Sequence, residues 1–183
     1  EALLRKWNTT INLVSRSTLD HVWKRHFLDS AQMLEMSAIS KGLWIDLGSG
    51  AGFPGLIIAI VAAEKAPGLR VTLVESDARK AAFLSTVARE TGVVCDIHNI
   101  RAEELSPSGA QVLSARALAP LSRLLALADR HLIAGGTALF PKGANWRAEV
   151  EAARRDWAFE ATPHPSKTNS DAVVLEIKGV SRA

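Results

Sequence analysis

Within residues 1–41, mainly apolar residues recur at intervals of three and four, which is the spacing of one face of a helix. The positions that share this face are Leu3, Leu4, Trp7, Leu19, Val22, Trp23, His26, Phe27, Ser30, Ala31 and Leu34. Thr18 precedes one helical run and Asp20 lies in its first turn, which predicts a helix start near Thr18. We therefore expect an N-terminal helical extension packed on the main domain, rather than a separate domain.

From residue 42 onward, short apolar runs alternate with amphipathic stretches. The runs predict strands at 43–47, 70–74, 93–97, 111–115 and 136–140, and the stretches between them predict helices at 55–64, 77–91, 120–131 and 146–156. Such alternation is typical of a parallel sheet covered by helices on both faces. Two further strands, 157–162 and 172–178, have no helix between them and predict an antiparallel pair at the sheet edge. Residues 42–183 are thus expected to form one α/β, Rossmann-like domain with a seven-stranded mixed sheet.

Composition narrows the class of protein without naming a reaction. The chain has 183 residues, of which 48% are hydrophobic and 22% charged, an ordinary globular balance. Cys95 is the only cysteine, which excludes an internal disulfide and a cysteine-rich zinc site; we expect it in the third strand, with a core role, and expect no metal. No run approaches the roughly 20 apolar residues of a membrane span, and no signal sequence opens the chain, so we expect a cytoplasmic protein without a membrane partner. The net charge of +3 is compatible with a polyanionic partner.

The most informative segment is the glycine-rich stretch between the first predicted strand and the helix after it. It places Gly48, Gly50, Gly52 and Gly55 within eight residues. Such a loop lets the backbone approach a ligand closely and points helix N–H groups at it. The spacing from Gly50 to Gly55 also matches G-x-G-x-x-G, the dinucleotide fingerprint. Glycine spacing alone therefore leaves both NAD and S-adenosylmethionine open.

Acidic residues at three successive strand ends favour the methyl donor. Glu75 closes the second strand, where a carboxylate can accept both ribose hydroxyls of either cofactor. Asp46 precedes the glycine loop and could hold the amino-acid end of S-adenosylmethionine, directly or through water. Ala102 and Glu103 follow the third strand, where methyltransferases commonly contact adenine. Phe53 could pack on the cofactor or anchor the loop in the core.

The absence of certain motifs narrows the choice of the substrate atom that receives the methyl group. Methylation of an exocyclic amine would call for Asn/Asp-Pro-Pro-Tyr/Phe after the fourth strand, where this chain reads Leu113-Ser114-Ala115-Arg116-Ala117. Methylation of pyrimidine C5 needs a cysteine at that end of the sheet, and the chain has no tyrosine to serve as a phenolic base. A nitrogen with a free lone pair, such as guanine N7, needs only in-line placement against the sulfonium methyl.

Several basic and aromatic residues could position an RNA substrate. Arg116 is suited to hydrogen-bond guanine O6 or to neutralise phosphate, with an ion pair as the structural alternative. Lys142 could meet phosphate or be solvated. Arg25 is a candidate RNA contact, whereas His26 and Asp29 lie three apart and are expected to pin the extension on the domain. Tryptophans 7, 23 and 146 could stack on bases at roughly 1–3 kcal/mol each, although the first two have core spacing.

Taken together, these segments resemble the bacterial glucose-inhibited division protein B family of 16S rRNA guanine-N7 methyltransferases. The matching segments are Lys6-Trp7-Asn8, Ile11-Asn12-Leu13, Arg25-His26-Phe27-Leu28-Asp29-Ser30, the 46–55 loop, Arg101-Ala102-Glu103-Glu104 and Arg116-Ala117. The resemblance implies a class I fold with S-adenosyl-L-methionine as methyl donor and S-adenosyl-L-homocysteine as product.

The resemblance also assigns residues and partners. It implies that Gly48, Phe53, Ala102, Glu103 and Arg116 match the family's cofactor-binding positions, and that Arg25, His26 and Lys142 form a basic rim. The implied partner is 16S rRNA, within the small ribosomal subunit or an assembly intermediate, and we expect a monomer. A methyltransferase for another RNA, a protein or a small molecule, an NAD-dependent oxidoreductase and a non-catalytic ribosome-assembly factor remain alternatives.

Overall fold

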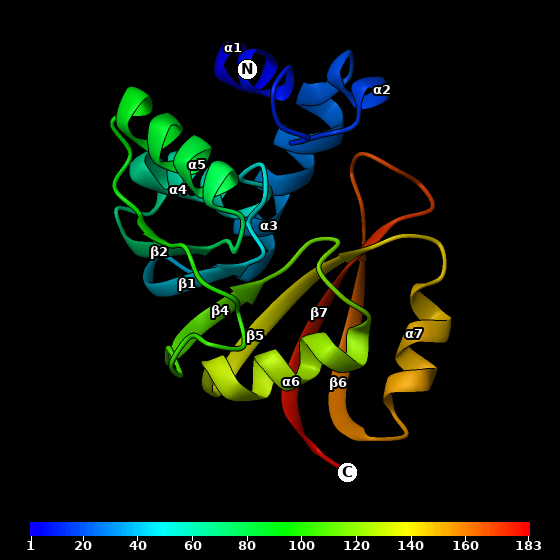
Figure 1. Ribbon diagram of the computed structural model, residues 1–183. Coiled ribbons are helices and arrows are strands. Elements are labelled where there is room, and N and C mark those ends of the chain that lie inside the picture. Colours follow the sequence, from blue (N-terminus) through cyan, green and yellow to red (C-terminus); the bar gives the residue numbers. More distant parts are fainter.

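The apolar runs form one seven-stranded sheet in the computed structural model, which describes residues 1–183 (Figure 1). The strands are β1 (Lys41–Leu47), β2 (Gly68–Val74), β3 (Asp96–His98), β4 (Ala110–Ser114), β5 (Leu132–Lys142), β6 (Trp157–Pro165) and β7 (Val173–Arg182). Their order in the sheet is β3-β2-β1-β4-β5-β7-β6. The first five run parallel, while β7 is antiparallel to both of its neighbours. The predicted mixed sheet and its antiparallel edge pair are confirmed.

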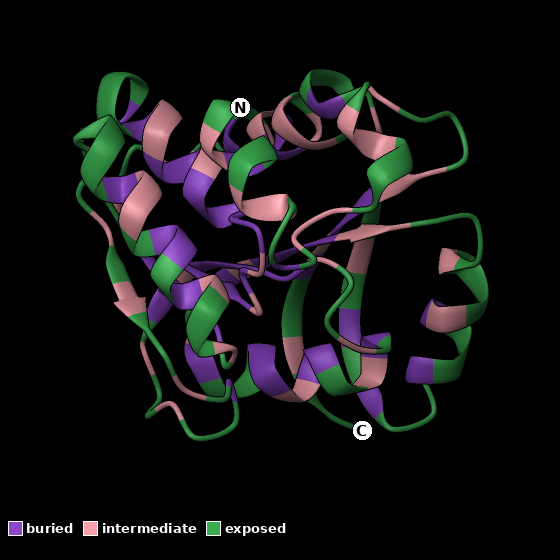
Figure 2. Ribbon diagram, turned by 45° about the horizontal axis from the view of Figure 1, so that its top comes forward, coloured by how far each residue is buried: buried purple, intermediate pink, exposed green.

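Alternate residues of the central strands face two separate cores, as the pleat of a strand requires. Two neighbouring residues of β1 illustrate this, because Trp44 joins one apolar cluster and Ile45 joins the other. The first cluster includes side chains of α4 (Gly55–Lys65) and α5 (Ala78–Thr91), and the second those of α6 (Leu121–His131) and α7 (Trp146–Ala153). Figure 2 shows the buried residues along the strands and the inner faces of these helices. Both faces of the sheet are therefore covered.

The extension consists of α1 (Ala2–Asn8), α2 (Arg16–Leu19), the π-helix η1 (Trp23–Leu28) and α3 (Asp29–Ser37). Leu4, Val22 and Met33 are buried in the same cluster as Trp44, so the extension shares a core with the sheet. The predicted helix start near Thr18 is wrong. Ser15 precedes a short helix that already contains Thr18 and ends at Leu19, and the next helix begins only at Trp23.

The third strand also differs from its prediction at 93–97, because it spans only Asp96–His98. Gly92 ends α5 in the left-handed conformation (φ +68°), and the amide of Val93 still bonds back to Ala88. The chain therefore leaves the helix before it can enter the sheet, and the side chain of Val94 is 94% exposed. Cys95 precedes the strand and packs partly buried against the first core, where burial raises the pKa of its thiol.

Other boundaries move by a few residues. The last helix, α7, ends at Ala153 instead of residue 156, and β5 starts at Leu132, directly after α6. None of the helices combines the length and the apolar character that crossing a bilayer would require.

The carboxyl ends of the five parallel strands lie along one edge of the sheet, where ligands bind in folds of this class.

Candidate active site

The glycine loop joins β1 to α4 at that edge, and three of its glycines adopt backbone angles that favour glycine. The φ angles of Gly48, Gly50 and Gly52 are +68°, +54° and +86°. A Cβ at Gly48 would approach Leu118 to 2.7 Å, and one at Gly52 would approach Leu56 to 2.7 Å. A Cβ at Gly50 would meet nothing closer than a backbone oxygen at 3.8 Å. Two of these glycines are thus needed for packing, whereas the third leaves the loop open to a ligand.

Glu75 follows β2 directly and holds the glycine loop in place. Its side chain is 7% exposed, and its Oε2 accepts a hydrogen bond from the amide of Gly50 at 2.7 Å. Its Oε1 accepts from the amide of Asp77 at 2.8 Å, and Asp77 in turn caps the first turn of α5. Each carboxylate oxygen keeps a further lone pair, and the acceptance of ribose hydroxyls by Glu75 stays a prediction.

Asp46 is completely buried at the carboxyl end of β1. Its Oδ1 accepts from the hydroxyl of Ser114 at 2.6 Å, and its Oδ2 accepts from the amide of Gly55 at 3.1 Å. Ser114 accepts in turn from the indole N–H of Trp44 at 2.9 Å. Burial raises the pKa of Asp46 to about 6, although these hydrogen bonds oppose the shift. The carboxylate therefore ties β1, β4 and the start of α4 together, and its predicted contact with a cofactor stays untested.

A cavity of about 220 Å³ lies beside the glycine loop and the segments that follow β2, β3 and β4. It is lined by Gly48, Val74, Ser76, Ile100, Arg101, Ala102, Glu103, Leu118, Ala119 and Arg123. Three predicted cofactor residues, Gly48, Ala102 and Glu103, therefore share one cavity. Val74, Ile100 and Leu118 give the lining an apolar part that suits a planar base, and Glu103 contributes a carboxylate. Glu103 also accepts a hydrogen bond from Arg123, which lowers the pKa of that carboxylate.

Arg116 follows β4 and lies against the glycine loop on the other side. Its guanidinium carbon is 5.1 Å from the centre of the Phe53 ring, and its side chain is 22% exposed. One guanidinium nitrogen, Nη2, lies 3.1 Å from Nδ1 of His26, while Nη1 lies 3.7 Å from Oδ2 of Asp29. The ring of His26 stacks on the same Phe53 ring, with centres 4.9 Å apart. The extension and the strand ends thus meet around Arg116.

The contacts of His26 determine its protonation state. Because arginine can only donate, Nδ1 of His26 must accept and Nε2 must carry the proton, which it donates to the Thr18 hydroxyl at 2.9 Å. Burial and, to a smaller extent, the charge of Arg116 lower the pKa of His26 to about 4. His26 is therefore neutral at pH 7 and supplies an acceptor rather than a positive charge.

The remaining predicted basic residues lie apart from this cluster. Arg25 is exposed on η1 and forms no ion pair. Lys142, whose side chain is only 10% exposed, donates to Glu149 Oε2 at 2.7 Å and to the carbonyl of Ala119 at 3.3 Å. No contact joins Lys142 to His26 or Arg116. Of the four residues predicted to position the substrate, the structure thus brings together His26 and Arg116, and the positioning role of all four stays a prediction.

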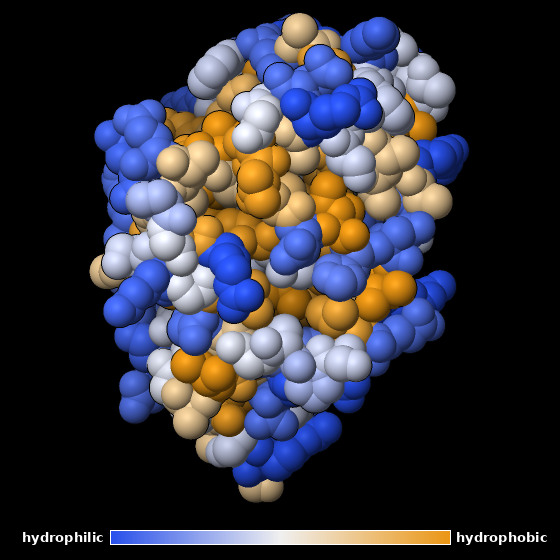
Figure 3. Space-filling model, turned by 90° about the vertical axis from the view of Figure 1, so that its left-hand side faces the viewer, coloured by the Kyte–Doolittle hydropathy of each residue, from blue (hydrophilic) through white to orange (hydrophobic).

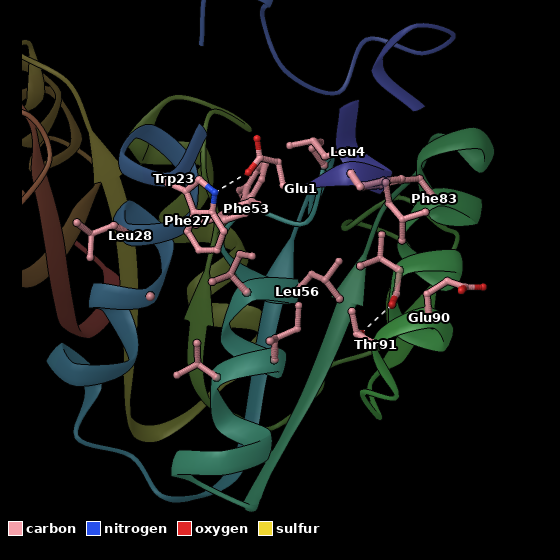
Figure 4. Close-up of a pocket in the computed structure, with 18 of the residues that line it drawn as sticks. Glu1, Leu4, Trp23, Phe27, Leu28, Phe53, Leu56, Phe83, Glu90 and Thr91 are labelled. Atoms are coloured by element: carbon pink, nitrogen blue, oxygen red, sulfur yellow. Dashed lines mark hydrogen bonds between the residues drawn. The ribbon is translucent and has the colours of Figure 1, made fainter. Parts of the chain in front are cut away.

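A larger apolar cavity of about 940 Å³ lies behind Phe53, between α1, η1, α4 and α5. Figure 4 shows Trp23, Phe27 and Phe53 on one side of it and Phe83 on the other, and Figure 3 shows apolar side chains gathered in a hollow on this face. No group of three or more His, Cys, Asp or Glu side chains is arranged to hold a metal ion.

Two residues that hold Asp29 beside Arg116 were not predicted from the sequence. The hydroxyls of Ser166 and Thr168, in the loop between β6 and β7, both donate to Oδ1 of Asp29. No local pattern indicates this contact, because the partners are separated by more than 130 positions. The contact of Ser114 with Asp46 could have been suspected from the sequence, since Ser114 is a polar residue at the end of a largely apolar strand.

Residues 1–173 match the family model described as GidB, rRNA small subunit methyltransferase G. The chain is 53% identical over 180 residues to the ribosomal RNA small subunit methyltransferase G of Ruegeria sp. (strain TM1040). The match covers 98% of this chain and 87% of that protein. The protein of the same name from Cereibacter sphaeroides (strain ATCC 17025) is 51% identical, over 98% of this chain and 86% of its own length.

Two solved structures confirm the class I methyltransferase fold. The glycopeptide N-methyltransferase MtfA, complexed with sinefungin, superposes with a TM-score of 0.65 at 13% identity, over 84% of this chain and 93% of that one. TYW2 of P. horikoshii, in complex with MeSAdo, superposes with a TM-score of 0.60 at 15% identity, over 82% and 61% of the two chains.

Proposed function

The chain belongs to the rRNA small subunit methyltransferase G family, and from this membership we propose that it transfers a methyl group from S-adenosylmethionine to N7 of a guanine in 16S rRNA. Membership confirms the resemblance found in the sequence motifs and the class of enzyme, an S-adenosylmethionine-dependent rRNA methyltransferase. It also decides against the NAD-dependent oxidoreductase, whose glycine fingerprint this loop happens to share.

The residues at the strand ends fit the methyl donor. The apolar part of the 220 Å³ cavity would accept an adenine ring, Glu75 is bonded to the glycine loop where it could accept ribose hydroxyls, and Gly50 leaves the loop surface open. When bound there, S-adenosylmethionine supplies a methyl carbon made electrophilic by the positively charged sulfur. We assign donor binding to the set Asp46, Gly48, Gly50, Gly52, Phe53, Glu75, Ala102, Glu103 and Arg116.

The choice of N7 is supported by one observation: the acidic and imidazole groups around Arg116 are already engaged. Both oxygens of Asp46 accept hydrogen bonds inside the core, and both nitrogens of His26 are committed to Thr18 and Arg116. Oδ1 of Asp29 accepts from three side chains, and its Oδ2 forms an ion pair with Arg116. A substrate nitrogen that must lose a proton would find no unpaired base here, whereas N7 of guanine attacks with a lone pair that it already has.

Catalysis then consists of positioning and the exclusion of water, which can supply as much as about 7–11 kcal/mol of a barrier. Arg116 is placed to hydrogen-bond guanine O6 or a phosphate, and His26 orients Arg116 from one side. Arg25 is free to meet phosphate, and Lys142 holds the segment after Arg116 by its bonds to Ala119 and Glu149.

The substrate is RNA in the small ribosomal subunit or in an assembly intermediate, and the enzyme acts as a monomer in the cytoplasm. The target guanine must leave its stack to reach the strand ends, at a cost of a few kcal/mol. The net charge of +3 favours association with the polyanion.

The test uses purified protein, tritiated S-adenosylmethionine and small ribosomal subunits that lack the modification. Borohydride and aniline cleave RNA at N7-methylguanosine, so primer extension should stop at one guanine of 16S rRNA. Label in RNA without such cleavage would contradict the N7 assignment, and label in protein would contradict the substrate. Naked 16S rRNA and precursor particles, assayed in parallel, identify the form of RNA that is used.

A further inference from the structure

Asp29, the first residue of α3, contacts Arg116 as well as the residues that attach the N-terminal extension to the domain. Its Oδ1 accepts from the side chain of Gln32 at 3.0 Å, from the hydroxyl of Ser166 at 3.1 Å and from the hydroxyl of Thr168 at 2.7 Å. Its Oδ2 is left to face Nη1 of Arg116 at 3.7 Å. One oxygen thus anchors the carboxylate, and the other is directed at the guanidinium.

The anchor on the first oxygen joins distant parts of the chain. The loop between β6 and β7 lies beside the N-terminal helices (Figure 1), and the amide of Lys167 donates to Oε1 of the buried Gln32 at 3.0 Å. The side chain of Lys167 pairs with Glu35 at 2.6 Å on the exposed side of α3. The hydroxyl oxygen of Ser166 also accepts from the amide of Thr168, which helps to hold the Ser166 side chain in place. The position of Asp29 is therefore set from two sides.

The surroundings of Arg116 leave Asp29 as its one carboxylate partner. Asp46 contributes its charge at longer range, but its oxygens bond to Ser114 and Gly55. Phe53 covers one face of the guanidinium, and His26 is a neutral acceptor. A planar cation with five donors takes a defined orientation only if acceptors are fixed around it. Asp29 is the charged acceptor in that arrangement.

We propose that Asp29 is a positioning residue for methyl transfer, which holds the guanidinium of Arg116 in the orientation that the incoming guanine requires. This inference rests on the function proposed above. Asp29 acts through Arg116 and not on the substrate, and the hydroxyls of Ser166 and Thr168 make the β6–β7 loop part of the same arrangement.

The test compares Asp29→Asn with Glu35→Gln as the matched control. Both substitutions remove one negative charge from α3 at a residue that contacts the β6–β7 loop, but only Asp29 faces Arg116. We expect Asp29→Asn to lower kcat about ten- to a hundredfold, the loss expected when a positioned group moves by about an ångström. The KM for S-adenosylmethionine should change less than kcat, and Glu35→Gln should keep the kcat of the unsubstituted protein.

A double-mutant cycle separates positioning from a general loss of structure. If Asp29 acts through Arg116, Asp29→Asn should have little further effect on kcat in an Arg116→Gln background. Should Asp29→Asn prove too unstable to assay, the cycle is run with Asp29→Glu, which keeps the charge but moves it by one methylene. Thermal unfolding is recorded for every variant.

Independent losses in the cycle, or equal effects of Asp29→Asn and Glu35→Gln, would overturn the inference. Absence of N7-methylguanosine in reactions of the unsubstituted protein would instead contradict the proposed function. The two failures are therefore distinguishable.

Discussion

The guanidinium of Arg116 lies over the ring of Phe53, with 5.1 Å between the guanidinium carbon and the ring centre. The same ring stacks on His26 and contacts Phe27 at 5.7 Å between centres. Phe53 belongs to the glycine loop, Arg116 to the segment after β4, and His26 to the N-terminal extension. One aromatic ring therefore joins the three segments that surround the proposed donor site.

This arrangement predicts different outcomes for two phenylalanines of similar burial. Phe53→Leu and Phe83→Leu each remove an aromatic ring from the same apolar core, where the two residues are 5% and 2% exposed. Both should lower the free energy of unfolding, by about 1–2 kcal/mol. Only Phe53→Leu should also weaken binding of S-adenosylhomocysteine, measured by isothermal titration. Equal loss of binding in both variants would show that core stability, rather than the loop, controls affinity.

Gly50 offers a second test of the donor site. Gly50→Ala and Gly92→Ala both place a side chain on a left-handed backbone, at φ +54° and +68°, and neither Cβ would meet an atom within 3.4 Å. The backbone strain should cost each variant about 1–2 kcal/mol of stability. Gly92 caps α5 away from the glycine loop, so only Gly50→Ala should reduce affinity for S-adenosylhomocysteine. Unchanged affinity in Gly50→Ala would contradict the proposed approach of the donor to this part of the loop.

The parts of this fold that sequence predicted depend on local patterns. The alternation of apolar runs and amphipathic stretches identifies the parallel strands because each run is short and is ended by polar or glycine residues. The start of β3 was wrong for a local reason as well: Val93 and Val94 have strand propensity, but the left-handed cap at Gly92 delays entry into the sheet.

The site was harder to predict, because its side chains are oriented by distant partners. Asp46 has the position expected of a ligand-binding carboxylate, yet it turns inward to Ser114, 68 positions away. Lys142 ends β5 at the edge where a phosphate contact was predicted, yet it pairs with Glu149 on α7. Neither orientation follows from residue spacing, since both depend on how the elements pack.

Arg25 and Lys142 should differ in how they affect RNA binding. Loss of one phosphate contact lowers the slope of log affinity against log salt by about one. Arg25 is exposed without an ion-pair partner, so Arg25→Gln should lower this slope. Lys142 is bonded to Glu149 and Ala119, so Lys142→Gln should keep the slope and instead reduce stability, by about 1–3 kcal/mol.

The measurement for this pair is filter binding of a 16S rRNA fragment across a range of salt concentrations, with urea unfolding of each variant. A lower slope for Lys142→Gln would show that the lysine leaves Glu149 and reaches phosphate when RNA binds. An unchanged slope for Arg25→Gln would remove Arg25 from the RNA interface.

The dependence of stability on pH should reveal the neutral His26. Its pKa is lowered to about 4 by burial, from an ordinary value of 6.5, so between these values the unfolded chain binds a proton that the folded chain does not. Stability therefore falls as the pH drops from 6.5 toward 4. Asp46 has the opposite sign, because burial raises its pKa to about 6 and the folded chain binds the extra proton. The two contributions oppose each other between pH 4 and 6.

His26→Gln should remove the first contribution and keep the second, while retaining an acceptor for Arg116. The loss of unfolding free energy between pH 7 and 5, measured by urea unfolding, should therefore be smaller in His26→Gln than in the unsubstituted protein. His131, which is buried with a lowered pKa, is present in both proteins and cancels in this comparison. An identical loss in the two proteins would mean that His26 is not held neutral by the fold, and the orientation of Arg116 by an unprotonated Nδ1 would have to be abandoned.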